Sequence, residues 1–130
     1  RFNANPVSMR ASLKVLEQAE GRKIAVLGDM GELGEDEVSM HYELGRDLAG
    51  MNIDELFTAG TLSRNSADGA QSVEDGGVNV HAFDTRDAMV VALVRSIEPG
   101  DTVLLKASHF MDFSMAVDTI CSNVGGGEAK

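Results

Sequence analysis

The sequence has little of the chemistry that would suit an oxidising compartment or a membrane. Its single cysteine, Cys121, cannot form an internal disulfide, which is typical of a reducing compartment. No apolar run approaches the ~18 residues needed to span a bilayer. The N-terminus also has no charged-then-apolar segment of the kind that directs secretion. We therefore expect a soluble, cytoplasmic domain without membrane insertion.

Basic residues and metal ligands are also scarce. The chain carries 11 Lys and Arg against 21 Asp and Glu, a formal net charge of −10. Because this negative charge would repel a phosphate backbone, we expect no nucleic acid partner. His41 and His81 have no Cys or second His at ligand spacing, so no metal site is predicted. No Ser-His-Asp arrangement can be argued from the spacing either, and we assign no catalytic residue.

The length favours one domain. A chain of 130 residues that is 43% hydrophobic is long enough for one compact domain with its own core and too short for two ordinary domains. It begins without an initiator Met, which suggests a fragment of a larger protein. We place the domain at residues 1–124. Residues 125–130 include three glycines and have nothing to bury, so we expect a flexible tail there.

Apolar periodicity predicts strands that alternate with helices. The strands are expected at Ile24–Leu27, Glu55–Ala59, Val78–Phe83 and Thr102–Lys106. The helices are expected from Asn5 to about Glu20, from an acidic first turn at 35–37 to near Gly50, from Leu62 to about Val73, around Met89–Ile97 and around Phe113–Val124. This alternation indicates an α/β fold in three layers, with a mostly parallel sheet of at least four strands. Ligands of such sheets bind at the carboxyl ends of the strands.

The stretch LGDMGELG, residues 27–34, follows the first strand at such an end. A dinucleotide loop has glycines spaced G-x-G-x-x-G, whereas these are spaced G-x-x-G-x-x-G around Asp29. A carboxylate there disfavours phosphate but suits ribose hydroxyls. Alternatively, Asp29 is a turn residue or a helix cap, and the spacing leaves both interpretations open.

Lys106 ends an otherwise apolar strand, and Ser108 and His109 follow it closely. An ammonium carried to the sheet edge, beside a hydroxyl, could hold a carboxylate or a phosphate. Alternatively, Lys106 extends its ammonium to solvent and Ser108 caps the next helix.

Three motifs together resemble one family. FNANPVSM at 2–9, LGDMGELG at 27–34 with His41 and Gly45 after it, and Lys-Ala-Ser at 106–108 are similar in order and separation to motifs in the C-terminal domain of Mur ligases. The resemblance is to the members that add D-alanyl-D-alanine to UDP-N-acetylmuramoyl-tripeptide, and it extends to about Val124. Phe2 stands where that family usually has Tyr, and His109 where Arg is common.

The resemblance implies a Rossmann-like C-terminal domain of a three-domain, ATP-dependent ligase of peptidoglycan synthesis. ATP and Mg²⁺ would activate the tripeptide carboxylate as an acyl phosphate, which the dipeptide amine then attacks. It also implies nucleotide binding by Asn3, Asn5 and Asp29, and dipeptide binding by Lys106, Ser108 and His109. The P-loop pattern G-x-x-x-x-G-K-S/T is absent from this chain. We therefore expect the central domain to bind most of the ATP and Mg²⁺, and the isolated fragment to be inactive.

Two other classes fit the chain less well. A signalling receiver domain is also small, acidic and α/β. It needs an acidic pair after its first strand, where this chain has the single Asp29. It also needs a phosphoacceptor Asp at the end of its third strand, which here ends at Phe83-Asp84. A stand-alone nucleotide-binding module would bind nucleotide steadily by itself, whereas a ligase shares its site between domains.

Overall fold

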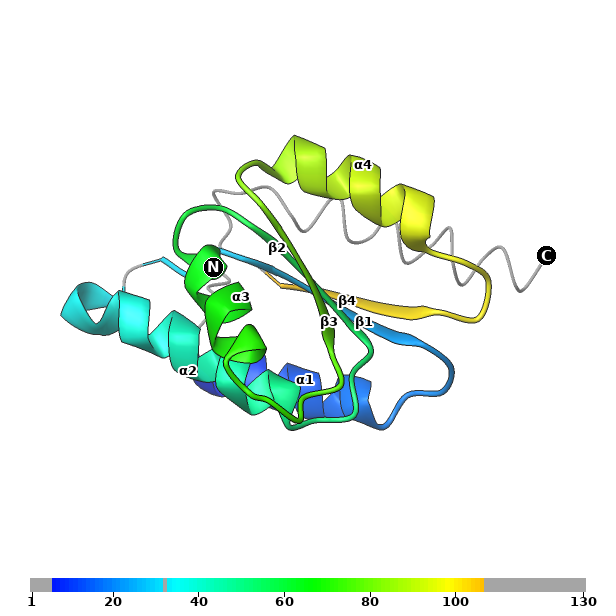
Figure 1. Cartoon of the computed structure of the whole chain (residues 1–130), viewed down its shortest axis with the longest axis horizontal. Coiled ribbons are helices and arrows are strands. Elements are labelled where there is room, and N and C mark those ends of the chain that lie inside the picture. Colours follow the sequence, from blue (N-terminus) through cyan, green and yellow to red (C-terminus); the bar gives the residue numbers. More distant parts are fainter. Residues whose placement is uncertain (1–5, 32, 107–130) are drawn as a thin grey trace.

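The computed structural model of the chain describes residues 6–31 and 33–106. Its elements, in chain order, are α1 (Pro6–Glu17), β1 (Lys23–Gly28), the 3-10 turn η1 (Gly34–Asp36), α2 (Glu37–Ala49), β2 (Glu55–Ala59), α3 (Ser63–Gln71), β3 (Asn79–Phe83), α4 (Arg86–Ser96) and β4 (Thr102–Lys106). Figure 1 shows the sheet between α4 on one face and α1, α2 and α3 on the other. The three-layer α/β fold predicted from the sequence is thus confirmed.

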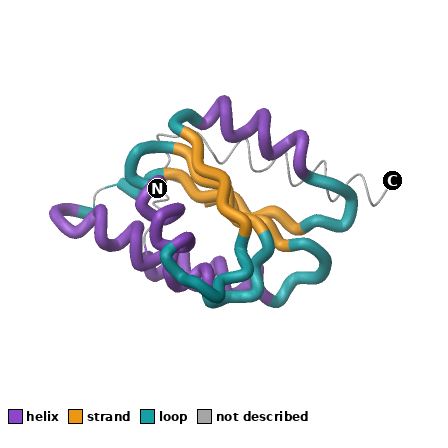
Figure 2. The backbone as a smooth tube through the Cα atoms, in the orientation of Figure 1, coloured by secondary structure: helices purple, strands orange, loops and turns teal. Residues whose placement is uncertain are grey.

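The four described strands form one parallel sheet in the order β3-β2-β1-β4. The chain builds outward from β1 to β3 and then returns through α4 to add β4 on the other side of β1. The strand order therefore reverses between β1 and β4, which is where open α/β sheets bind ligands. Figure 2 follows this path along the backbone.

The central strand β1 is buried along its whole length, as expected for a parallel strand covered on both faces. Its alternate side chains enter two cores. Ala25 and Leu27 pack with apolar residues of α1, α2 and α3. Ile24 and Val26 pack with residues of α4, β2 and β4. Both helical layers are therefore anchored on the strand that leads into LGDMGELG.

Helices α2 and α3 approach each other closely because two glycines face the partner helix. A Cβ on Gly45 would collide with the Ser66 carbonyl, and a Cβ on Gly69 would collide with the Tyr42 carbonyl. Side chains larger than hydrogen at these two positions would push the helices apart. This contact sets the place of α3 beside the loop that follows β1.

Element boundaries agree with the sequence predictions to within a few residues. Strands β2 and β4 have the predicted bounds. Helix α1 ends at Glu17 rather than at Glu20, because the amides of Gln18 and Ala19 bond the carbonyls three residues earlier and tighten the last turn. The helix predicted around Phe113–Val124 lies outside the described residues. Within 6–31 and 33–106, no helix is long and apolar enough to cross a membrane.

Candidate functional site at the carboxyl edge of the sheet

The parallel sheet places Asp29 and Lys106 on neighbouring strands at the same edge. Lys106 is the last residue of β4 and pairs in register with Leu27 of β1, two residues before Asp29. Both side chains are partly buried. The strands that lead to Asp29 and Lys106 are therefore direct neighbours in the sheet. Asn3, Asn5, Ser108 and His109 lie outside the described residues, so their places at this edge stay predictions.

The Asp29 carboxylate caps a helix that is distant in the sequence. Its Oδ1 accepts a hydrogen bond of 2.7 Å from the backbone N–H of Ser63, the first residue of α3. The residue at the N-cap position, Leu62, offers no side-chain acceptor. An acidic group at this position satisfies an otherwise unpaired amide and faces the positive end of the helix dipole. The helix-cap interpretation of Asp29 is therefore correct, although the capped helix is α3 and not the one that follows in sequence.

Gly60 makes room for that carboxylate. A Cβ at this position would stand 2.5 Å from Asp29 Oδ1, and the Gly60 φ of +115° is one that other residues rarely adopt. Ser63 secures the same corner, since its hydroxyl donates 2.7 Å to the carbonyl of Ala59. The end of β2 and the start of α3 are thus shaped around Asp29.

The cap is compatible with a second role for Asp29. A carboxylate has about four acceptor positions, so its bond to the Ser63 amide does not by itself prevent it from accepting a ligand hydroxyl. Asp29 is partly exposed at the edge where ligands of this fold bind. Ribose recognition by Asp29 stays a prediction.

The other charged side chains described near this edge do not form a metal site. Arg64 and Asp84 form an exposed ion pair of 2.8 Å, a kind that contributes little to stability. In the part of the chain that the structure describes, no three His, Cys, Asp or Glu side chains come close enough to hold a metal ion.

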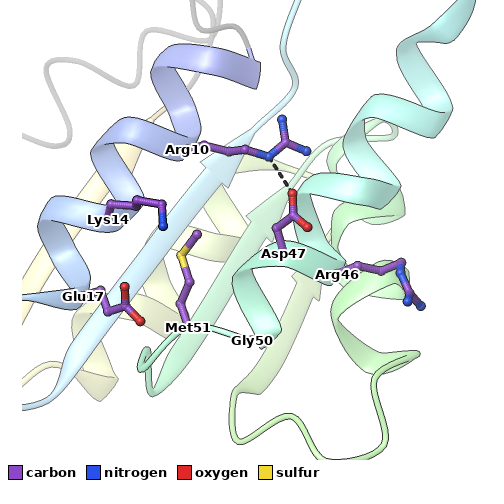
Figure 3. A pocket seen from close by; sticks show the side chains of 7 residues that line it. All are labelled: Arg10, Lys14, Glu17, Arg46, Asp47, Gly50 and Met51. Atoms are coloured by element: carbon purple, nitrogen blue, oxygen red, sulfur yellow. Dashed lines mark hydrogen bonds and ion pairs between the residues drawn. The ribbon is translucent and has the colours of Figure 1, made fainter.

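A groove of about 500 Å³ lies between α1 and α2, away from the predicted site (Figure 3). It is lined by Arg10, Lys14, Glu17, Arg46, Asp47, Gly50 and Met51. Both of its carboxylates are already bonded: Asp47 to Arg10 at 2.6 Å, and Glu17 to the amide of Asn52 at 3.0 Å. Gly50 and Met51 follow α2 and lead into β2, so the groove lies toward the amino edge of the sheet. It does not bring together any residue predicted to bind a ligand.

Sequence reasoning missed three residues that shape the site. Gly60, Ser63 and His41 all contact the Asp29 loop, His41 through the amide of Met30 at 3.0 Å. The sequence analysis named His41 only as part of the family motif and as lacking a metal-ligand partner, and it gave His41 no role at the site. A glycine directly after the second strand can indicate that another group packs closely against the backbone there. The sequence does not show that this group is the Asp29 side chain.

Comparison with known proteins gives the family. Residues 1–109 match the profile described as Mur ligase, glutamate ligase domain. This range contains all three motifs on which the sequence resemblance rests.

Individual relatives agree with that match. The chain is 37% identical to a UDP-N-acetylmuramoyl-tripeptide–D-alanyl-D-alanine ligase of Bacillus subtilis, over 85% of this chain and 24% of the relative. It is 34% identical to the ligase of that name from Mycobacterium tuberculosis, over 94% of this chain and 28% of the relative. The chain thus spans about a quarter of the length of these relatives.

Solved structures give the same picture. A crystal structure of MurF from Acinetobacter baumannii superposes with a TM-score of 0.77 at 32% identity, covering 93% of this chain and 27% of that one. MurF ligase from Thermotoga maritima, in complex with ADP, gives 0.68 at 26% identity, covering 96% and 27%. With its parallel sheet, its motifs and these matches, the chain belongs to the Mur ligase family.

Proposed function

We propose that this chain is the C-terminal domain of an ATP-dependent ligase that joins D-alanyl-D-alanine to UDP-N-acetylmuramoyl-tripeptide in peptidoglycan synthesis. The observation that carries the proposal is the adjacency of β1 and β4, which brings Asp29 and Lys106 to one ligand-binding edge within a chain of this family. Relatives that bear the name of this ligase match along most of the chain.

We assign the nucleotide to the Asp29 side of this edge. The carboxylate would accept from the ATP ribose while it caps α3, and Asn3 and Asn5 would complete the contact from the segment before α1. The ADP complex of the Thermotoga maritima relative supports a nucleotide-binding role in the family. A side chain already held by Ser63 needs little further ordering when the nucleotide binds, which favours affinity.

We assign the incoming dipeptide to the Lys106 side. The ammonium would pair with the terminal carboxylate of D-alanyl-D-alanine, the Ser108 hydroxyl would add a directed bond, and His109 would contribute charge only when protonated. The pairing of Lys106 with Leu27 supports this arrangement, because it places the lysine next to the strand that leads to Asp29.

The phosphoryl-transfer chemistry belongs to other parts of the ligase. The chain has no P-loop pattern, and no three His, Cys, Asp or Glu side chains gather in its described residues to hold a metal ion. We therefore propose that the β- and γ-phosphates, Mg²⁺ and the UDP-tripeptide bind mainly outside this chain. We further propose that the domain extends to Val124 with a flexible tail at 125–130, segments outside the described residues, and that it acts in the cytoplasm, where ATP is supplied.

The test compares the 130-residue chain with the longer ligase that contains it. We expect the longer protein to release ADP only when both D-alanyl-D-alanine and UDP-N-acetylmuramoyl-tripeptide are present. The chain alone should fold and release none above a matched blank. ADP release by the chain alone, or by the longer protein without the dipeptide, would contradict the proposal. Tight nucleotide binding by the chain alone would instead identify a stand-alone nucleotide-binding module.

A further inference from the structure

A buried histidine connects α2 to the loop that follows β1. His41 is 1% exposed. Its Nδ1 lies 2.6 Å from the carbonyl oxygen of Glu37, one turn earlier in α2, and its Nε2 lies 3.0 Å from the backbone nitrogen of Met30. Both ring nitrogens are therefore engaged with backbone groups.

The two partners determine which nitrogen carries the proton. A carbonyl oxygen can only accept, so Nδ1 must carry the hydrogen that lies between it and Glu37. A backbone N–H can only donate, so Nε2 must present its lone pair to Met30. A proton on Nε2 would set two N–H groups against each other in a buried place. The geometry thus requires the neutral ring with hydrogen on Nδ1.

This bond acts next to the predicted nucleotide site. Met30 directly follows Asp29, whose carboxylate is held by the Ser63 amide of α3. The backbone of His41 is tied to the same helix, because the Ser66 hydroxyl donates 2.7 Å to the His41 carbonyl. The Asp29–Met30 segment is therefore fixed from two directions, by α3 through the Asp29 side chain and by α2 through the His41 ring.

We propose that His41 is a positioning residue for nucleotide binding. Its ring, with hydrogen on Nδ1, holds the Met30 amide and so keeps the preceding Asp29 carboxylate aimed at the ATP ribose. The ring itself does not contact the nucleotide. This inference rests on the proposed function of Asp29, but the hold on Met30 can be tested separately.

The first experiment uses NMR on the 130-residue chain. We expect ring ¹⁵N shifts that place the hydrogen of His41 on Nδ1. In His41→Phe, which keeps an aromatic ring but lacks the acceptor, the Met30 amide should exchange with solvent about tenfold faster or more. The Val26 amide in the middle of β1 should be unchanged. His41→Gln should retain most of the Met30 protection, because its amide oxygen can accept.

His81→Phe is the matched control, since His81 is half-exposed on β3, stacks on Phe57 and makes no contact with this loop. It should leave exchange of the Met30 amide unchanged. A hydrogen on Nε2 of His41 in the unsubstituted chain would overturn the proposal even if the Phe variant does not fold. Equal Met30 exchange in the His41→Phe variant and the unsubstituted chain would also overturn it.

The second experiment measures steady-state kinetics of the longer ligase. His41→Phe should raise the KM for ATP about tenfold, change kcat less and leave the KM for the dipeptide unchanged. His41→Gln should keep the KM for ATP close to that of the unsubstituted ligase. If Asp29→Ala raises the ATP KM and His41→Phe does not, the positioning role is wrong while the proposed function stands. If neither substitution changes the ATP KM, the nucleotide role of Asp29 is wrong and the inference fails with it.

Discussion

Asp29 has a structural role in the fold in addition to the ligand role that we propose for it. Its carboxylate satisfies the first amide of α3 from a loop 34 residues away in sequence, in a corner kept open by Gly60. A carboxylate at a helix start also interacts favourably with the helix dipole. Removing it therefore has a cost in stability that does not depend on any ligand.

We predict that Asp29→Ala lowers the free energy of unfolding of the 130-residue chain by about 1–2 kcal/mol, because it leaves the Ser63 amide without its acceptor. Urea unfolding followed by circular dichroism measures this loss. Asp29→Asn should lose less, since its amide oxygen can still accept.

Asp84→Ala is the control for Asp29→Ala, because it removes a carboxylate that forms only an exposed ion pair with Arg64. It should change the free energy of unfolding by less than about 0.5–1 kcal/mol. Equal losses in the two alanine variants would show that Asp29 does not stabilise α3.

Among the secondary-structure elements, the contact between α2 and α3 determines where the candidate site lies. Gly45 and Gly69 allow the two helices to meet backbone to backbone, and Ser66 and His41 add a hydrogen bond across the contact. The start of α3 receives Asp29, and α2 holds the loop through His41. The geometry of the loop therefore depends on the spacing of these two helices.

We predict that Gly45→Ala destabilises the chain by about 1–3 kcal/mol, because the new methyl group would collide with the Ser66 carbonyl. The urea midpoint measures the effect. Gly77→Ala is the matched control: nothing lies within 4 Å of its added Cβ, and its φ is outside the left-handed region. Similar midpoints for the two variants would contradict the close packing of α2 on α3.

Across the whole molecule, an ion pair joins the starts of β1 and β4, the two strands whose opposite ends lead to the candidate site. Arg22, just before β1, bonds both oxygens of Asp101, just before β4, at 3.2 and 2.7 Å, and also reaches the Ser96 carbonyl at 2.6 Å. The Glu98 amide donates to the same carboxylate at 2.8 Å. This cluster holds the amino ends of β1 and β4 in register, opposite the edge that carries Asp29 and Lys106.

This cluster makes stability depend on pH. Burial raises the pKa of Asp101, but the hydrogen bonds from Arg22 and Glu98 and the charge of the guanidinium outweigh it, so the pKa lies below its ordinary value of 3.8. The ionised Asp101 carboxylate therefore stabilises the folded chain. This stabilisation is fully present at pH values above the ordinary pKa and is lost as the pH falls through the lowered pKa. We predict that Asp101→Asn is less stable than the parent chain at pH 7.

The difference in unfolding free energy between Asp101→Asn and the parent chain should shrink as the pH is lowered below about 4. Urea unfolding of both proteins at a series of pH values measures it. A difference that stays constant from neutral to acidic pH would show that the Asp101 charge does not stabilise the fold.

The sequence predicted this architecture well because its strands are short buried apolar runs between turn residues. The apolar run of β1 and the helical segment between each pair of strands favoured a parallel sheet over other arrangements. A parallel sheet in turn predicted which residues lie at the carboxyl ends of the strands. The contacts of Asp29 with Ser63 and of Met30 with His41 were not predictable in this way. The first depends on where α3 packs beside the loop, the second on how α2 folds back over it, and no local sequence pattern encodes either placement.

The most direct test of the central claim, that Asp29 and Lys106 bind different substrates at one edge of a ligase domain, is a pair of KM measurements on the longer ligase. Asp29→Ala should raise the KM for ATP about ten- to a hundredfold and leave that for D-alanyl-D-alanine nearly unchanged. Lys106→Met should raise the KM for the dipeptide well above that for ATP, and Ser108→Ala should do so more weakly. Equal effects of Lys106→Met on both substrates, or no effect of either Asp29→Ala or Lys106→Met on any KM, would contradict the claim.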